Sequence, residues 1–178
     1  ACVDSGGCNG YRPNDAGWGR GRQPVINVSW DDAQAYVRWL SQRTGRGYRL
    51  LTESEREYVT RSGTDTAFWF GSTIRPDQAS YDGNWIYGSG VKGVYRGRAI
   101  AVGSFPSNGF GLHDVHGNVW EWVEDCYGAY SSALIDGSAI TGHNCPRVLR
   151  GGSWDGLPSS LRSANRSDGQ VSVATPGG

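Results

Sequence analysis

The chain of 178 residues carries 17 Lys and Arg against 17 Asp and Glu, so its formal net charge is zero. A balanced charge gives no electrostatic attraction to nucleic acid or to an anionic membrane surface. No apolar run approaches the roughly 20 residues that cross a bilayer. We therefore expect neither a nucleic-acid partner nor direct membrane insertion, and the length suits one domain.

The composition is rich in glycine and in large aromatic side chains, with 28 Gly, 8 Trp and 9 Tyr. Disordered chains lack large aromatic residues to bury, so this composition indicates a folded protein. It is typical of a loop-rich fold held together by buried aromatic rings, each covering about 150–250 Å².

The four cysteines form two pairs that are close in sequence, Cys2 with Cys8 and Cys126 with Cys145. Neither pair has the spacing of a structural zinc site. Two local disulfides would imply an oxidising compartment, and hence an extracellular or cell-surface location. The alternative is four reduced thiols in a cytosolic protein.

Two amphipathic helices are predicted in the first third of the chain. Ser29 is a good N-cap for a helix that Gly45 ends, with acidic residues in its first turn. Thr52 and Glu55 make a capping box for a second helix that Gly63 ends. Both helices need an apolar surface to pack on, and we expect a sheet.

Strands are predicted later in the chain. The stretch 119–123 alternates valine and glutamate with Trp120 and Trp122, which is typical of a strand. RVLRGGSW is a second strand, interrupted at Gly151 and Gly152 by a bulge or a close backbone approach. AIAVGSF, residues 99–105, is a further short candidate. The pattern predicts one α+β domain over residues 1–178, and because the chain opens mid-pattern at ACVDSGGC we expect a fragment of a longer protein.

Four segments in order, NVSWDDAQAYVRWL, YRLLTESEREY, GLHDVHGNVWEW and RVLRGGSW, resemble the formylglycine-generating enzyme (sulfatase-modifying factor) family. The resemblance runs from about Pro24 to Arg166. It implies a C-type lectin-like fold of the α+β class, in which two helices pack on a small twisted antiparallel sheet and loops make up much of the chain.

The resemblance also implies where catalysis would lie. The family's enzymes are copper-dependent oxidases that convert a sulfatase cysteine into formylglycine, and their active cysteines follow the GGS element. Those positions hold Gly156 and Leu161 here. Nearby serines, Ser159, Ser160 and Ser163, cannot replace a soft thiolate as a copper(I) ligand. We therefore expect no copper and a protein that is not an enzyme.

A second branch of the same family resembles this chain more closely: the variable ligand-binding proteins of diversity-generating retroelements, with GGSW, a polar stretch, LRSANR and another polar stretch. This branch implies a non-catalytic domain that displays a diversifiable surface to a protein ligand. The implied ligand-binding residues are Trp154, Asp155, Gly156, Leu157, Ser159, Ser160, Ser167, Asp168, Gly169, Val171 and Ser172.

Three alternatives stay open at this point. The polar stretches could be ordinary loops, the protein could be a formylglycine-generating oxidase acting on a peptide cysteine, or it could be an accessory domain of a larger protein. Trp154 fits either a core position or the floor of a binding face. The sequence leaves the oligomeric state open.

The GNVWEW segment resembles a calcium site of the family. The implied ligands are Gly117, Asn118, Val119 and Glu121, since calcium takes 6–8 oxygen ligands. The alternative is that Glu121 pairs with Arg150 or Arg166.

Two further expectations concern polar side chains. Arg150, Arg162 and Arg166 are assigned to the scaffold, because a guanidinium joins several loop carbonyls or carboxylates at once. His116, in the tight VHGN turn, is expected at the surface rather than in a metal triad with His113 and His143.

Overall fold

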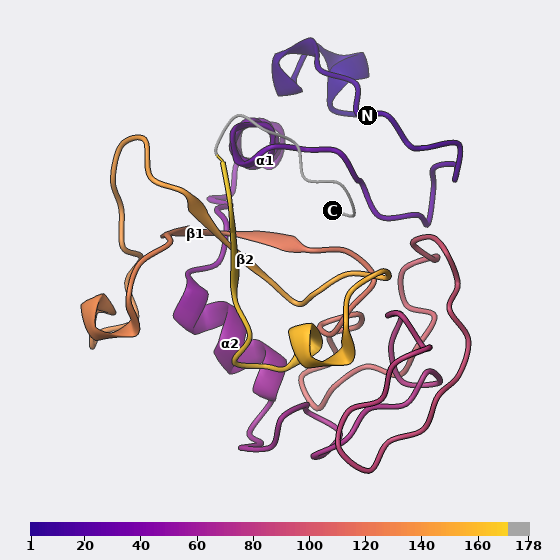
Figure 1. Ribbon diagram of the computed structural model, residues 1–178. Coiled ribbons are helices and arrows are strands. Elements are labelled where there is room, and N and C mark those ends of the chain that lie inside the picture. The colour runs from indigo at the N-terminus through magenta and orange to yellow at the C-terminus, as the bar shows by residue number, and fades with distance from the viewer. Residues whose placement is uncertain (171–178) are drawn as a thin grey trace.

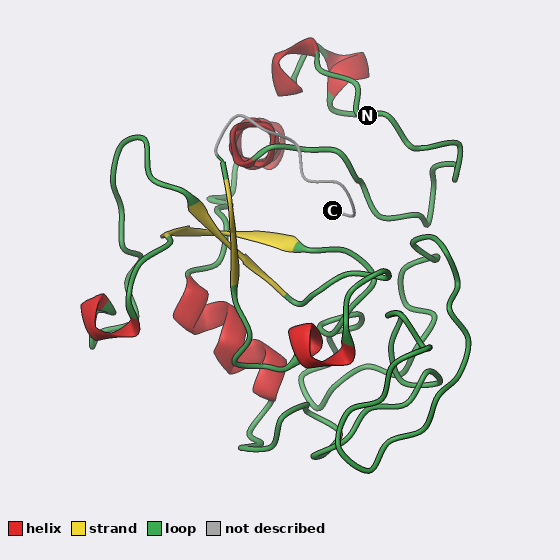
Figure 2. Ribbon diagram, viewed as in Figure 1, coloured by secondary structure: helices red, strands yellow, loops and turns green. Residues whose placement is uncertain are grey.

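The computed structural model describes residues 1–170 (Figure 1). Val171 and Ser172, both expected in the binding surface, lie outside the described residues. The regular elements are α1 (Trp30–Thr44), α2 (Glu53–Arg61), β1 (Glu121–Cys126), β2 (Arg147–Arg150) and β3 (Ser167–Gly169), with short 3-10 turns that include η4 (Pro158–Leu161). Loops make up most of the described chain (Figure 2).

Both helices begin at the predicted caps. Ser29 accepts a hydrogen bond from the Asp32 N–H, and the Asp32 carboxylate accepts one from the Ser29 N–H. Thr52 and Glu55 form the same reciprocal box at the start of α2. Gly45 ends α1 in the left-handed conformation, whereas Ser62, not Gly63, takes that role after α2.

The three strands form one antiparallel sheet in the order β1-β2-β3. Trp122 pairs with Leu149 across the first interface, and Val148 pairs with Asp168 across the second. Both helices contact this sheet: α2 packs against β1 and β2, and the Trp30 indole N–H at the start of α1 donates to the Val123 carbonyl at 2.9 Å (Figure 1). This is the expected α+β arrangement of two helices on a small sheet.

The predicted strand at residues 99–105 is wrong. Ile100 exchanges hydrogen bonds with the Asn118 side-chain amide, at 2.9 and 3.2 Å, and Val102 donates to the Arg22 carbonyl. The backbone of this stretch is therefore satisfied by a buried amide and by a loop rather than by a neighbouring strand.

One cluster of large buried apolar side chains lies under the loops. Phe68, Ile74, Ala79, Tyr81 and Leu161 form a cluster in which every member is almost fully buried. Four come from the long loop after α2, and Leu161 comes from η4. The loop region is therefore ordered because it encloses its own apolar core.

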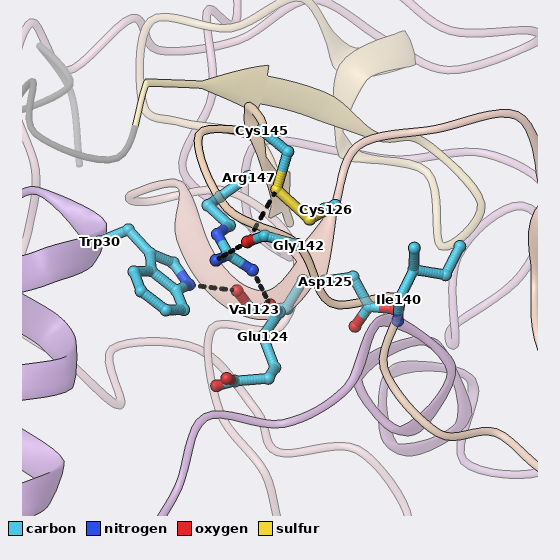
Figure 3. Close-up of a disulfide and its surroundings, with 9 residues drawn as sticks. All are labelled: Trp30, Val123, Glu124, Asp125, Cys126, Ile140, Gly142, Cys145 and Arg147. Carbon is cyan, nitrogen blue, oxygen red and sulfur yellow. Dashed lines mark hydrogen bonds between the residues drawn. A yellow bond between two sulfur atoms is a disulfide. The ribbon is translucent and has the colours of Figure 1, made fainter.

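Both predicted disulfides are present, Cys2–Cys8 and Cys126–Cys145. The second closes the loop between β1 and β2 (Figure 3). Beside it, the Arg147 guanidinium stacks on the Trp30 ring at 3.9 Å and donates to the carbonyls of Glu124 and Gly142. A disulfide, a cation–π contact and two hydrogen bonds thus hold the base of the loop.

None of the helices in residues 1–170 combines the length and apolar character that crossing a bilayer requires.

Candidate functional site

The turn after β2 sets the position of everything that follows it. Gly151 and Gly152 have φ angles of 97° and 80°, which favour glycine. A Cβ at Gly152 would lie 2.7 Å from Leu161 Cδ1, so the backbone there approaches the core too closely for any side chain. The Gly151 carbonyl accepts a hydrogen bond from the Gly117 N–H at 2.8 Å. The predicted close backbone approach at the glycine pair is confirmed.

Trp154 follows this turn and is half-buried between two other rings. Trp18 meets it edge-on at 5.6 Å between centroids, and Tyr95 stacks on it at 5.9 Å. Its backbone N–H donates to the Asn118 carbonyl. Among the described residues its indole nitrogen is buried with no hydrogen-bond partner. Trp154 therefore both anchors the turn and contributes to the surface.

The residues after Trp154 alternate between exposed and supported positions. Asp155 is exposed, and so is Leu157, with 48 % of its surface accessible. Gly156, Ser159 and Ser160 are half-buried, and the Gly156 carbonyl accepts a hydrogen bond from the Asp82 N–H at 3.0 Å. Of the first polar stretch, Asp155 and Leu157 are the side chains best placed to meet a ligand.

The second polar stretch is β3. Asp168 is exposed there, while Ser167 and Gly169 are half-buried in the pairing with β2. A Cβ at Gly169 would lie 2.4 Å from the Trp122 ring, so this position admits glycine only. Gly169 thus packs against the sheet. Other residue types do not fit at this position, although the expected role in a diversifiable surface would require them.

The two polar stretches lie on different supports. The first belongs to the turn and to η4, whereas β3 runs along the sheet toward α1 (Figure 1). Within residues 1–170 no hydrogen bond joins residues 154–160 to residues 167–169. The structure therefore divides the expected binding residues into two groups.

The positions of the family's cysteines offer no reactive group. Gly156 has no side chain, and Leu161 is fully buried in the core cluster. Ser163, one of the nearby hydroxyls, is buried as well. All four cysteines of the chain are in the two disulfides, so no thiol is free.

The expectation of a surface His116 is wrong. The side chain is 3 % exposed and lies edge-on to Phe68 and Phe70 at 5.4 Å. Nε2 accepts the Trp69 N–H, so Nδ1 carries the proton and donates to the Leu161 carbonyl at 2.7 Å. Burial lowers the pKa of His116 to about 3. The ring is a neutral connector between two loops.

The four expected calcium ligands line one pocket together with Asp114, whose Oδ1 is buried with no hydrogen-bond partner among the described residues. Asn118 is buried, and its Oδ1 accepts the Ile100 N–H. Glu121 pairs through Oε2 with Arg56 at 2.9 Å, rather than with the expected Arg150 or Arg166. In the part of the chain that the structure describes, no three His, Cys, Asp or Glu side chains are grouped as metal ligands. Calcium binding by Gly117, Asn118, Val119 and Glu121 stays a prediction, and no step below uses it.

The arginines of the frame connect the LRSANR segment to α2. Arg150 is 1 % exposed, pairs with Glu57 and donates to the carbonyls of Ser163 and Asn165. Arg166 pairs with Glu53. Arg162 donates to the Ser159 carbonyl at 3.0 Å. These contacts agree with the scaffold role expected from the sequence.

Some residues of the site were not found from the sequence. Trp18, Asp82 and Tyr95 meet the turn after β2 from distant segments. Each is a common residue type in an irregular loop, so no local pattern points to it. The abundance of tryptophan and tyrosine was the one available signal.

Comparison with known proteins identifies the family. Residues 2–176 match the model of the sulfatase-modifying factor enzyme 1-like domain. The formylglycine-generating enzyme of Bos taurus is 37% identical over 141 residues, covering 74% of this chain and 35% of that protein. The chain thus spans about a third of the length of this relative.

Solved structures show the same fold. PvdO of Pseudomonas aeruginosa superposes with a TM-score of 0.76 at 38% identity, over 88% of this chain and 60% of that one. Treponema denticola variable protein 1 superposes with a TM-score of 0.69 at 23% identity, over 94% and 72%. The second likeness shows the fold alone. The chain belongs to the sulfatase-modifying factor enzyme 1-like family.

Proposed function

We propose that this chain is a non-catalytic ligand-binding domain that presents the turn after β2 to another protein. The observation that carries the proposal is the chemistry at the family's cysteine positions: Gly156 and Leu161 hold no thiol, and every cysteine of the chain is in a disulfide. Copper(I) is bound in proteins by soft thiolate ligands. Copper-dependent oxidation therefore lacks its ligands here.

The geometry of the turn supports a binding role. The glycine pair, the Gly117 contact and the Arg150 ion pair fix the backbone, while Asp155 and Leu157 extend outward from it. A rigid frame that carries exposed side chains lowers the entropy lost on binding. The likeness of fold to a variable protein from Treponema denticola is consistent with this role.

We place Asp168 and Ser167 of β3 in the same function as a second contact surface. We also propose an extracellular or cell-surface location, because two disulfides persist in an oxidising environment.

The second candidate is a formylglycine-generating oxidase that acts on a peptide cysteine, which the 37% identity to the bovine enzyme favours. The test incubates the protein with copper, dioxygen and a cysteine-containing peptide, followed by mass spectrometry. We expect the peptide to be recovered unchanged, while the bovine enzyme oxidises it in parallel. Turnover by this chain would establish the oxidase instead.

Binding is tested by selecting ligands from a random peptide library on the intact protein. The variant Asp155→Ala/Leu157→Ala should lose the selected ligands. The matched control is Asp65→Ala/Ile135→Ala, which removes one exposed carboxylate and one exposed aliphatic side chain elsewhere. Ligands that bind both variants equally would place the binding surface elsewhere.

A further inference from the structure

Three aromatic rings from distant segments meet at the turn after β2. Trp154 contacts Trp18 edge-on and Tyr95 face-on, and Tyr95 is 43 % exposed. Trp18 and Trp154 are half-buried, so all three rings keep part of their surface accessible to solvent. Aromatic π faces attract cations, and arginine most often among side chains.

Two carboxylates flank the cluster. Asp155 directly follows Trp154, and the Asp82 backbone is held at the same turn by its N–H bond to the Gly156 carbonyl at 3.0 Å. The pKa of Tyr95 is raised, by loss of solvation first and then by the charges of Asp155 and Asp82. Both carboxylates therefore act on the same ring.

Neither carboxylate has a cationic partner within residues 1–170. Asp155 Oδ1 accepts only the Ser153 hydroxyl, and Asp82 Oδ1 accepts the backbone and side-chain N–H groups of Asn84. Ion pairs among the described residues use other carboxylates. A neighbouring cation, Arg96, is directed elsewhere, over the Phe105 ring and to the Pro76 carbonyl.

A second place in the protein combines aromatic rings and a carboxylate with a bound arginine. Arg166 lies over the rings of Tyr127 and Tyr130, at 4.6 and 4.5 Å, and pairs with the Glu53 carboxylate. Two aromatic rings, a carboxylate and an arginine satisfy one another there. At the turn after β2 the rings and carboxylates are present and the arginine is not.

We propose that Tyr95, Trp154, Asp82 and Asp155 form a recognition site for an arginine side chain of a partner protein. The guanidinium stacks on the aromatic cluster and donates to the carboxylates. This inference rests on the binding function proposed above, because it names the chemistry of the partner that the same turn receives.

The probe is the capped pentapeptide Gly-Ser-Arg-Ser-Gly, titrated into the isotope-labelled full chain and followed by amide NMR shifts. We expect shifts at Asp82, Tyr95, Trp154 and Asp155, and none when citrulline replaces arginine. The variant Asp82→Asn/Asp155→Asn should bind about tenfold more weakly. The matched control, Asp65→Asn/Asp136→Asn, removes one carboxylate with no ion pair and one in a similar hydrogen-bonded turn, and should bind like the wild type.

The single variant Asp155→Asn, at an exposed position, replaces the double variant if the latter fails to fold. Shifts confined to other surfaces, or equal binding by the citrulline peptide, would overturn the arginine assignment. If library ligands still depend on Asp155 and Leu157 in that case, the binding function stands without it. If the copper assay shows turnover while the arginine shifts persist, the binding-only function fails and the arginine site remains.

Discussion

His116 is a neutral side chain held between backbone groups of two loops. Its two ring nitrogens are satisfied by Trp69 and Leu161, and burial lowers its pKa from 6.5 to about 3. Between those two values the unfolded chain binds a proton that the folded protein does not. The free energy of unfolding contributed by His116 is therefore complete above about pH 6.5 and is lost as pH falls toward 3.

This linkage predicts that the protein is less stable at mildly acid pH. Lowering the pH from 7 to 5 should reduce the free energy of unfolding by about 2 kcal/mol. Each pH unit below 6.5 lowers this free energy by up to about 1.4 kcal/mol, because the unfolded chain binds a proton that the folded protein does not. Urea unfolding at the two pH values measures it. His116→Gln should remove most of this pH dependence, whatever its own stability. If the wild type and the variant lose the same unfolding free energy between pH 7 and 5, a group other than His116 takes up the proton on unfolding.

At the scale of elements, Arg150 joins β2 to α2 and to the LRSANR segment. It is 1 % exposed and pairs with Glu57 on α2, whose other carboxylate oxygen pairs with Arg61 at 2.8 Å. Sequence reasoning placed Arg150 in the scaffold but could not identify Glu57, because the two residues are 93 positions apart.

Replacing Arg150 by Met should lower the free energy of unfolding by about 3–5 kcal/mol, since it breaks a buried ion pair and leaves the carbonyls of Ser163 and Asn165 without their donor. Adding Glu57→Gln should recover little of the loss, because Glu57 keeps its ion pair with Arg61 in the single variant. Thermal and urea unfolding give both values. The exposed pair of Arg75 and Asp77 serves as the control, and Arg75→Met should change stability little. A small effect at Arg150 would mean that solvent reaches the carbonyls of Ser163 and Asn165 and that Arg61 alone balances Glu57.

The two disulfides differ in the length of chain that they close. Cys126 and Cys145 are 19 positions apart, and Cys2 and Cys8 are 6 apart. Loop-closure entropy predicts a loss of about 3 kcal/mol when the first pair is replaced by alanine and about 2 kcal/mol for the second. Urea unfolding of the two double variants ranks them. The reverse order would indicate that contacts such as those of Arg147 hold the longer loop without the bond.

At the scale of the whole molecule, substitutions at exposed positions and in the buried core should have different effects on stability. Asp155, Leu157 and Asp168 are exposed, and exposed changes usually cost under about 0.5 kcal/mol each. Replacing all three by alanine should therefore leave Tm within a few degrees. Leu161→Ala, only four residues beyond Leu157, should cost about 2–5 kcal/mol because it empties a fully buried site. Calorimetry compares them, and a collapse of the triple variant would place these residues in the core.

The sequence alone predicted what depends on neighbours along the chain. The two N-caps, the pairing of the cysteines and the tight turn at Gly151 and Gly152 are local, because their partners lie within a few residues or a single loop. The order of four longer motifs was enough to indicate the family and its fold.

Only the tertiary structure decided which distant groups meet. It buried His116, paired Glu121 with Arg56, used the Asn118 amide in place of a strand next to Ile100, and brought Trp18 and Tyr95 to Trp154. In a fold made mostly of loops, backbone and side-chain polar groups find their partners across long separations. Such partners are selected by packing in three dimensions, and no periodicity along the chain records them.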